Sequence, residues 1–91
     1  MTVQELIDAL NKVENKSKSI LMNGEYVTVF NEYDTEVHLW ENQENVTVQE
    51  FIDSLNKITD KLKPILLYDE NLAEPEKIYE IEENDYEINL W

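Results

Sequence analysis

The sequence of 91 residues lacks cysteine, so no disulfide and no thiolate metal site can supplement its core. It also lacks a continuous apolar run at its beginning, where Glu5, Asp8 and Asn11 interrupt the apolar residues. A signal peptide or a membrane span requires an uninterrupted apolar stretch. We therefore expect a cytoplasmic protein that is soluble from its first residue.

Arginine is absent as well, and the seven basic residues, all lysine, stand against 21 acidic residues, which gives a net charge of -14. Such an excess repels nucleic acid and anionic membranes, whereas it attracts basic protein surfaces. The hydrophobic content of 42% excludes a disordered acidic tail. We expect a folded protein whose partner is a basic protein surface, with no direct binding to nucleic acid or membrane.

Catalytic and metal-binding patterns are also missing. The single histidine, His38, has no cysteine or second histidine with which to form a nucleophile–base pair or a zinc site. The segment 69–71 lacks the spaced ligands, central glycine and terminal glutamate of an EF-hand. Acid–base chemistry needs carboxylates in unlike environments within a cleft, but most acids here fall on faces expected to be in water. We predict no enzyme activity, no catalytic residue, no metal and no cofactor.

What the sequence does contain is a tandem repeat. The segment 2–12 returns as 47–57 with nine of eleven positions identical, and 34–40 corresponds to 85–91 after an insertion of six residues. Two copies are too few for an open solenoid, and a copy of about 45 residues is too small for a core of its own. We predict one domain over 1–91, built of copy one (1–40), a connection (41–45) and copy two (46–91). The copies close on each other within one chain, as a monomer, or exchange between two chains as a dimer.

Each copy has the pattern of one helix followed by three short strands. Both copies open with Thr-x-x-Glu, a capping box that starts a helix, and apolar residues follow at helical spacing. Brief apolar runs at 20–22 and 65–68 come next, and then alternating segments that end in tryptophan. The predicted fold class is α+β: a tandem duplication of a helix plus a three-stranded antiparallel meander, with pseudo-twofold symmetry and the helices packed on the sheet.

One strand register stays open at this point. In copy one, Val27 and Val29 suggest one inward face, but the aligned residues of copy two are Ile78 and Glu80. This alignment leaves Tyr79 and Ile81 as the apolar pair of the strand, on the other face from Ile78. Either the strand slips or both of its faces are partly covered.

Copy two carries a dense row of acidic residues. Same-face residues on a strand lie about 6.6 to 6.8 Å apart, which is comparable to the spacing of phosphates along a nucleic-acid strand. We therefore predict that these residues bind the basic partner by imitating phosphates. The alternative interpretation is that they keep a small sheet soluble and protect its edges. The nine carboxylates, which fall within nineteen residues beside a single lysine, are Asp69, Glu70, Glu74, Glu76, Glu80, Glu82, Glu83, Asp85 and Glu87.

Trp40 and Trp91 occupy equivalent ends of the last predicted strand of each copy, on the face opposite the predicted core. An aromatic residue beside carboxylates is typical of an interface anchor for arginine or lysine. Both tryptophans are therefore candidate partner-binding residues. The alternative is that each covers the end of the core or packs across the pseudo-twofold axis.

The opening Thr-Val-Gln-Glu-Leu-Ile and its second copy, each followed by a short strand and a hairpin ending in tryptophan, resemble small phage or mobile-element proteins that begin Thr-Val-Lys-Glu-Leu-Ile. In size, charge and two-unit organisation the chain also resembles phage-encoded anti-CRISPR and anti-restriction inhibitors, several of which imitate DNA. This resemblance implies an acidic nucleic-acid mimic that blocks the basic channel of a host defence nuclease in the bacterial cytoplasm. Two alternatives stay open: an immunity protein or antitoxin for a basic toxin, and a phage accessory adaptor without inhibitory activity.

Overall fold

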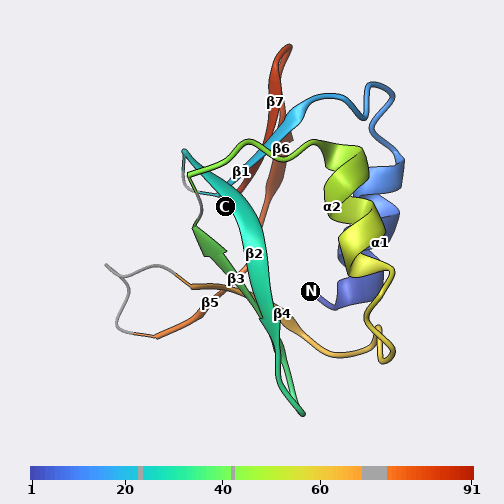
Figure 1. Cartoon of the computed structure of the whole chain (residues 1–91), viewed down its shortest axis with the longest axis vertical. Helices are drawn as coiled ribbons and strands as arrows, with labels where there is room; N and C mark the ends of the chain where they lie inside the picture. Colours follow the sequence, from blue (N-terminus) through green and yellow to red (C-terminus); the bar gives the residue numbers. More distant parts are fainter. Residues whose placement is uncertain (23, 42, 69–73) are drawn as a thin grey trace.

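The computed structural model describes residues 1–22, 24–41, 43–68 and 74–91. In this part of the chain, two helices lie side by side against a curled sheet of seven strands (Figure 1). The elements in chain order are α1 (Val3–Asn11), β1 (Ser19–Met22), β2 (Glu25–Glu32), β3 (Val37–Glu41), α2 (Val48–Leu55), β4 (Ile65–Tyr68), β5 (Glu76–Lys77), β6 (Ile81–Glu83) and β7 (Glu87–Leu90).

Both helices begin with the capping box, as predicted. The Thr2 hydroxyl accepts a hydrogen bond from the Glu5 N–H at 3.1 Å, and the Glu5 carboxylate accepts one from the Thr2 N–H at 3.0 Å. Thr47 and Glu50 make the same two bonds, each at 3.2 Å. Because the ionised carboxylate accepts the backbone and side-chain hydrogen bonds of Thr2, the pKa of Glu5 lies below its ordinary value of 4.5.

Each helix is followed by a turn that a lysine closes. The Lys16 ammonium donates to the carbonyl oxygens of Asn11 at 3.1 Å and Val13 at 2.7 Å. Lys61, the aligned residue of copy two, donates in the same way to the carbonyl oxygens of Asn56 at 3.1 Å and Ile58 at 2.6 Å. The last carbonyls of a helix have no partner within it and carry partial negative charge, so a cation at this end is favourable.

The predicted fold class is wrong. The sheet is mixed, because β1 runs parallel to β7 and β3 runs parallel to β4, and each parallel pair joins copy one to copy two. In the described part of the chain the strand order is β5-β4-β3-β2-β1-β7-β6. Copy two therefore forms no three-stranded meander: its first strands stand at one end of this order and its last strands at the other. Strands, not helices, make up most of the regular structure.

The physical reason for this error is that the apolar pattern of a strand carries information about its buried face and not about its neighbouring strands. An apolar, alternating pattern determines that a strand buries one face, but it does not determine which strand lies beside it. A copy of about 45 residues cannot bury a core of its own, and interleaving the strands lets both copies enclose a single core. Local sequence therefore located the strands without giving their partners.

The two ends of the strand order are joined by consecutive residues. Three residues separate β5 from β6, and they continue the ladder with the end of the chain: the Tyr79 N–H donates to the Trp91 carbonyl at 2.7 Å, and the Trp91 N–H donates to the Glu80 carbonyl at 2.9 Å. The segment 76–83 thus pairs with β4 at its beginning and with β7 at its end. The sheet curls on itself as a result (Figure 1).

An irregularity in this segment resolves the open register. The N–H groups of Tyr79 and Glu80 both donate to the same Trp91 carbonyl, at 2.7 and 3.2 Å, and the pairing of β2 with β3 shifts at the aligned place, between Val27 and Val29. Such an extra residue is a β-bulge, which resets the alternation of faces. Ile78 is buried and Ile81 is half-buried against the core, although they are three residues apart.

The two copies complete each other's helices. The first N–H groups of a helix have no partner within it, and here each helix finds these partners in the other copy. Four such bonds cross between the copies: Val3 N–H to Lys63 O at 3.0 Å, Gln4 N–H to Lys61 O at 2.9 Å, Val48 N–H to Lys18 O at 2.8 Å and Gln49 N–H to Lys16 O at 3.0 Å. Neither copy can satisfy the N–H groups of its first two helical residues without the other.

A single apolar cluster lies between the helices and the inner face of the sheet. The helices contribute their predicted apolar stripes, and the strands contribute the residues that alternate inward. The side chains that are fully buried include Leu6, Leu10, Phe51, Leu55, Ile20, Leu39, Ile65 and Leu90.

Truncation of one helix residue tests this packing. Leu10 is fully buried, so Leu10→Ala should lower the free energy of unfolding by about 2 to 5 kcal/mol through the cavity it leaves. Urea denaturation measures this loss. Leu62 is 78% exposed, and the control Leu62→Ala should change stability by less than about 0.5 kcal/mol. Equal effects of the two substitutions would contradict the assigned core.

A second prediction concerns the pH dependence of the first capping box. Since the pKa of Glu5 is lowered in the folded chain, its stabilising contribution is present above the ordinary value of 4.5 and is lost as pH falls through the folded pKa. Unfolding at a series of pH values below neutral should show a steeper acid loss of stability for the wild type than for Glu5→Gln. Glu14→Gln, which removes an exposed carboxylate outside the box, should follow the wild type. Parallel curves for all three proteins would refute the prediction.

Candidate partner-binding surface

The structure divides the predicted acidic residues into groups. Asp69 and Glu70 lie outside the described residues. Glu74 and Glu76 lie at β5, beside β4, whereas the other five lie on the hairpin formed by β6 and β7: Glu80, Glu82, Glu83, Asp85 and Glu87. We call residues 80–87 the acidic hairpin. The expected single row along one hairpin is thus shortened to this segment.

Within the acidic hairpin, the carboxylates differ in their surroundings. Glu80, Glu82 and Asp85 are exposed, and no hydrogen bond or ion pair engages their side chains within the described part of the chain. Glu82 lies opposite Asn89 in the ladder, and Glu83 lies opposite Ile88. Because neighbouring strand residues point to opposite faces, the Glu82 carboxylate is on the outer face of the sheet, away from the helices.

Glu83 has a structural role. The Lys18 ammonium donates to the Glu83 carboxylate at 2.6 Å and to the Asn84 carbonyl at 2.7 Å, which ties copy one to the acidic hairpin. Lys63 of copy two makes the aligned contacts with copy one: it donates to the Glu32 carboxylate at 3.0 Å and to the Tyr33 carbonyl at 2.8 Å. The Lys18 side chain is 12% exposed, so most of its attraction for carboxylates is used within the fold.

The turn of the acidic hairpin is held by Asn84. Its side-chain oxygen accepts hydrogen bonds from the N–H groups of Tyr86 and Glu87, both at 2.9 Å, and its side-chain nitrogen donates to the Glu87 carboxylate at 3.4 Å. Such an Asx turn fixes the backbone locally. It holds Asp85 and Tyr86 at an exposed tip.

Aromatic side chains accompany the exposed carboxylates. Tyr79 is 82% exposed, Tyr86 is 84% exposed and Trp91 is 40% exposed. The hydrogen bond between the Tyr79 N–H and the Trp91 carbonyl places these two residues side by side next to Glu80. Sequence reasoning missed Tyr79 because, without the bulge, it alternates with Ile81 onto an apolar face. It missed Tyr86 because that residue belongs to a turn.

Trp40 differs from Trp91, although the two are aligned. Its ring lies 3.9 Å from the ring of Tyr68, and Tyr68 in turn stacks on His38 at 5.8 Å with an interplanar angle of 11°. Tyr33 continues this row with a centroid 4.8 Å from His38. Trp40 is half-buried, so it packs in an aromatic row across β3 and β4. Of the two interpretations of the tryptophans, its geometry favours packing for Trp40 and leaves Trp91 as the exposed candidate.

His38 belongs to this row. Its Nε2 lies 3.4 Å from the Glu36 carboxylate, a contact that is electrostatic without hydrogen-bond geometry. Among the described residues, His38 Nε2 and Trp40 Nε1 are buried nitrogens without a hydrogen-bond partner.

The lysines explain how strongly negative the exterior is. Of the seven lysines, Lys16 and Lys61 bind the helix ends, and Lys18 and Lys63 bind the hairpins of the opposite copy. All four cations donate to carbonyl oxygens inside the fold, and two of them also contact a carboxylate. The excess of carboxylates therefore remains at the surface.

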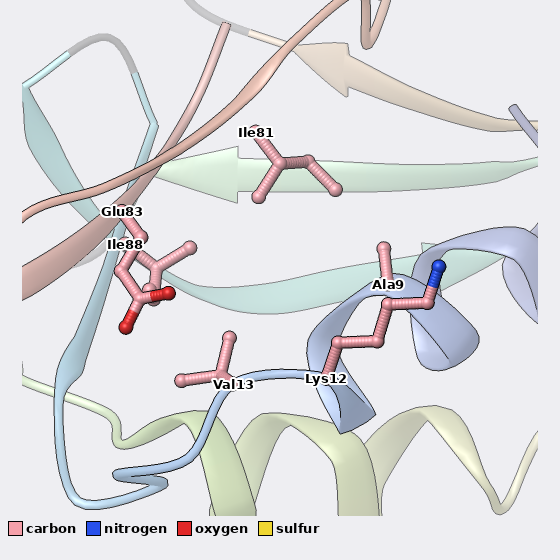
Figure 2. Close-up of a pocket in the computed structure, with 6 residues that line it drawn as sticks. All are labelled: Ala9, Lys12, Val13, Ile81, Glu83 and Ile88. Carbon is pink, nitrogen blue, oxygen red and sulfur yellow. The ribbon is translucent and has the colours of Figure 1, made fainter.

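A small open pocket of about 210 Å³ lies between the end of α1 and the inner side of the acidic hairpin (Figure 2). Its lining is mostly apolar, and Lys12 and Glu83 add charge. The residues around it are Ala9, Lys12, Val13, Ile81, Glu83 and Ile88. The Lys12 ammonium and the Glu83 carboxylate point in different directions (Figure 2). Of the apolar side chains that line the pocket, Val13 and Ile88 are buried, whereas Ala9 and Ile81 are half-buried.

The described residues offer few other kinds of site. Among them, no three histidine or acidic side chains are grouped so that they could hold a metal ion. In the same part of the chain, neither helix has the length and apolar character needed to cross a membrane. Comparison of the chain with protein-family models, with curated proteins and with solved structures finds no match in any of the three.

The contact of Lys18 with the acidic hairpin can be tested by hydrogen exchange. Lys18→Met should loosen the turn of the acidic hairpin while β1 still pairs with β7, and amide exchange in the turn should become about fivefold faster, which corresponds to about 1 kcal/mol for a partly exposed charged contact. Lys12→Met, which also removes one positive charge, should leave these rates within about twofold of the wild type. Equal acceleration in both variants would mean that charge, not the contact, sets the rate.

Proposed function

We propose that this chain is an acidic protein-binding inhibitor that occupies a basic surface of its partner, the nucleic-acid channel of a bacterial host nuclease. One observation carries the proposal: four of the seven lysines are used within the fold, while Glu80, Glu82 and Asp85 stand exposed on one hairpin. A surface of one sign attracts its opposite and raises the rate of association. Inhibition follows from occupancy, so the chain needs no reaction of its own.

The form of the acidic hairpin supports imitation of phosphates. Carboxylates on alternating strand residues are separated by about 6.6 to 6.8 Å, a distance close to that between successive phosphates of one strand. The Asn84 turn and the Lys18 contact hold the hairpin in place. A preorganised array loses less entropy on binding than a flexible acidic tail.

The aromatic residues support a second candidate, an immunity protein or antitoxin for a basic toxin. Tyr79, Tyr86 and Trp91 are exposed beside the carboxylates, and tyrosine and tryptophan are enriched among residues that dominate protein–protein binding energy. Such anchors favour one dedicated protein partner. A pure mimic of the phosphate backbone relies more on charge.

The proposal is tested with a variant that removes charge from the hairpin and retains its fold. The triple variant Glu80→Gln, Glu82→Gln, Asp85→Asn spares Glu83 and Glu87, which make structural contacts. A nuclease captured by the wild type from a bacterial lysate should bind the variant at least about tenfold more weakly. Cleavage of DNA or RNA by the captured nuclease should be inhibited stoichiometrically by the wild type and not by the variant.

The matched control removes the same number of charges elsewhere. Glu14→Gln, Glu25→Gln, Asp34→Asn neutralises three exposed carboxylates outside the acidic hairpin and should retain inhibition. Binding of the wild type should weaken steeply with salt and compete with nucleic acid. Full inhibition by the hairpin variant would reject this surface. Capture of a toxin that does not bind nucleic acid would favour the immunity candidate.

A further inference from the structure

The strand β6 has a free edge. It stands at the end of the strand order, and in the described part of the chain it pairs with β7 alone. The Glu80 and Asn84 N–H groups both donate toward the β7 side, to Trp91 O and Glu87 O. In an antiparallel ladder alternate residues bond to the same side, so the intervening Ile81 and Glu83 direct their backbone groups to the open edge.

The pocket lies along this same edge. Ile81 and Glu83 line it from the sheet. Ala9 lines it from α1, and Val13 lines it from the turn that follows this helix (Figure 2). Residues side by side on neighbouring strands point to the same face. A strand added to β6 would therefore place the side chains that neighbour Ile81 and Glu83 into the pocket, and those that neighbour Glu82 on the outer face.

Charge decides which strand can occupy the edge. A second copy of this chain would bring its own acidic hairpin against Glu80 and Glu82, and like charges directly opposite are destabilising. A lysine-bearing strand would place its cations against the same carboxylates. The outer-face position is thus suited to a basic residue, and the inner position is suited to an apolar one.

We propose that β6 is a docking edge to which an extended segment of the basic partner adds as a further strand, with alternating basic and apolar residues. One apolar side chain of that segment fills the pocket between Ile81 and α1, and its basic residues face Glu82. Strand addition supplies main-chain hydrogen bonds for affinity and a side-chain pocket for specificity. The inference rests on the proposed function, because it specifies how the acidic hairpin holds its partner.

The sequence repeat supplies an internal control. The residues of copy two aligned with Ala9 and Val13 are Ser54 and Ile58, which are both larger. Ala9 and Ser54 are half-buried alike. A substitution at Ala9 and the same substitution at Ser54 therefore change equivalent helix positions, but the first alone enters the pocket beside β6.

The experiment uses the full chain and a short blocked peptide of alternating lysine and valine. Isotope-labelled protein should show amide shifts at Ile81 and Glu83 on titration. Ala9→Leu, which fills the pocket, should weaken binding about tenfold because the valine loses its buried surface. Ser54→Leu should bind as the wild type does. The same peptide N-methylated at alternate residues keeps its charge and side chains but should bind at least about tenfold more weakly.

The outcomes separate this inference from the proposed function. If the triple variant Glu80→Gln, Glu82→Gln, Asp85→Asn lost peptide binding while Ala9→Leu and N-methylation left it unchanged, strand addition would be overturned and charge recognition would stand. Equal binding of a glutamate–valine peptide would overturn both. A dimer in sedimentation that Ala9→Leu abolishes would assign the edge to a second copy and reject the basic strand. If Ala9→Leu fails to fold, the N-methylated peptide still decides.

Discussion

The structure depends on backbone hydrogen bonds that each copy supplies to the other. The first N–H groups of α1 bond to carbonyls just before β4, and those of α2 bond to carbonyls just before β1. The same segments continue into the two parallel strand pairs, β3 with β4 and β1 with β7. A buried helix start without partners would cost the desolvation of several donors. Folding of either copy is therefore inseparable from docking on the other, and a small chain obtains one enclosed core without disulfide or metal.

This interlocking also governs the charge. Four lysines lie where chain segments of the two copies meet or where a helix ends. Their ammonium groups donate hydrogen bonds to carbonyl oxygens and to two carboxylates. Mutual repulsion among the remaining carboxylates opposes the compact state, but most of them lie on exposed strand and turn positions where water screens them. The fold thus tolerates a net charge of -14 and displays it.

The two copies have diverged in what they present. The bulge in the segment 76–83 turns Tyr79 outward beside Trp91, whereas Trp40 packs on Tyr68. Copy two also carries the exposed acidic hairpin, whose inner side lines an open pocket together with the end of α1 from copy one. In the function proposed above, these exposed tyrosine and tryptophan side chains of copy two are the ones that meet the partner.

The sequence by itself determined the features that depend on near neighbours along the chain. Capping at Thr2 and Thr47, the apolar helix stripes and the existence of short strands follow from contacts within a few residues, so pattern and spacing are sufficient. The tertiary structure decided which strands pair, where the bulge falls and which carboxylates gather, because these depend on partners distant in sequence. Glu83 illustrates the difference. In the sequence it reads as an ordinary surface acid, but its contact with Lys18, 65 residues away, joins the two copies.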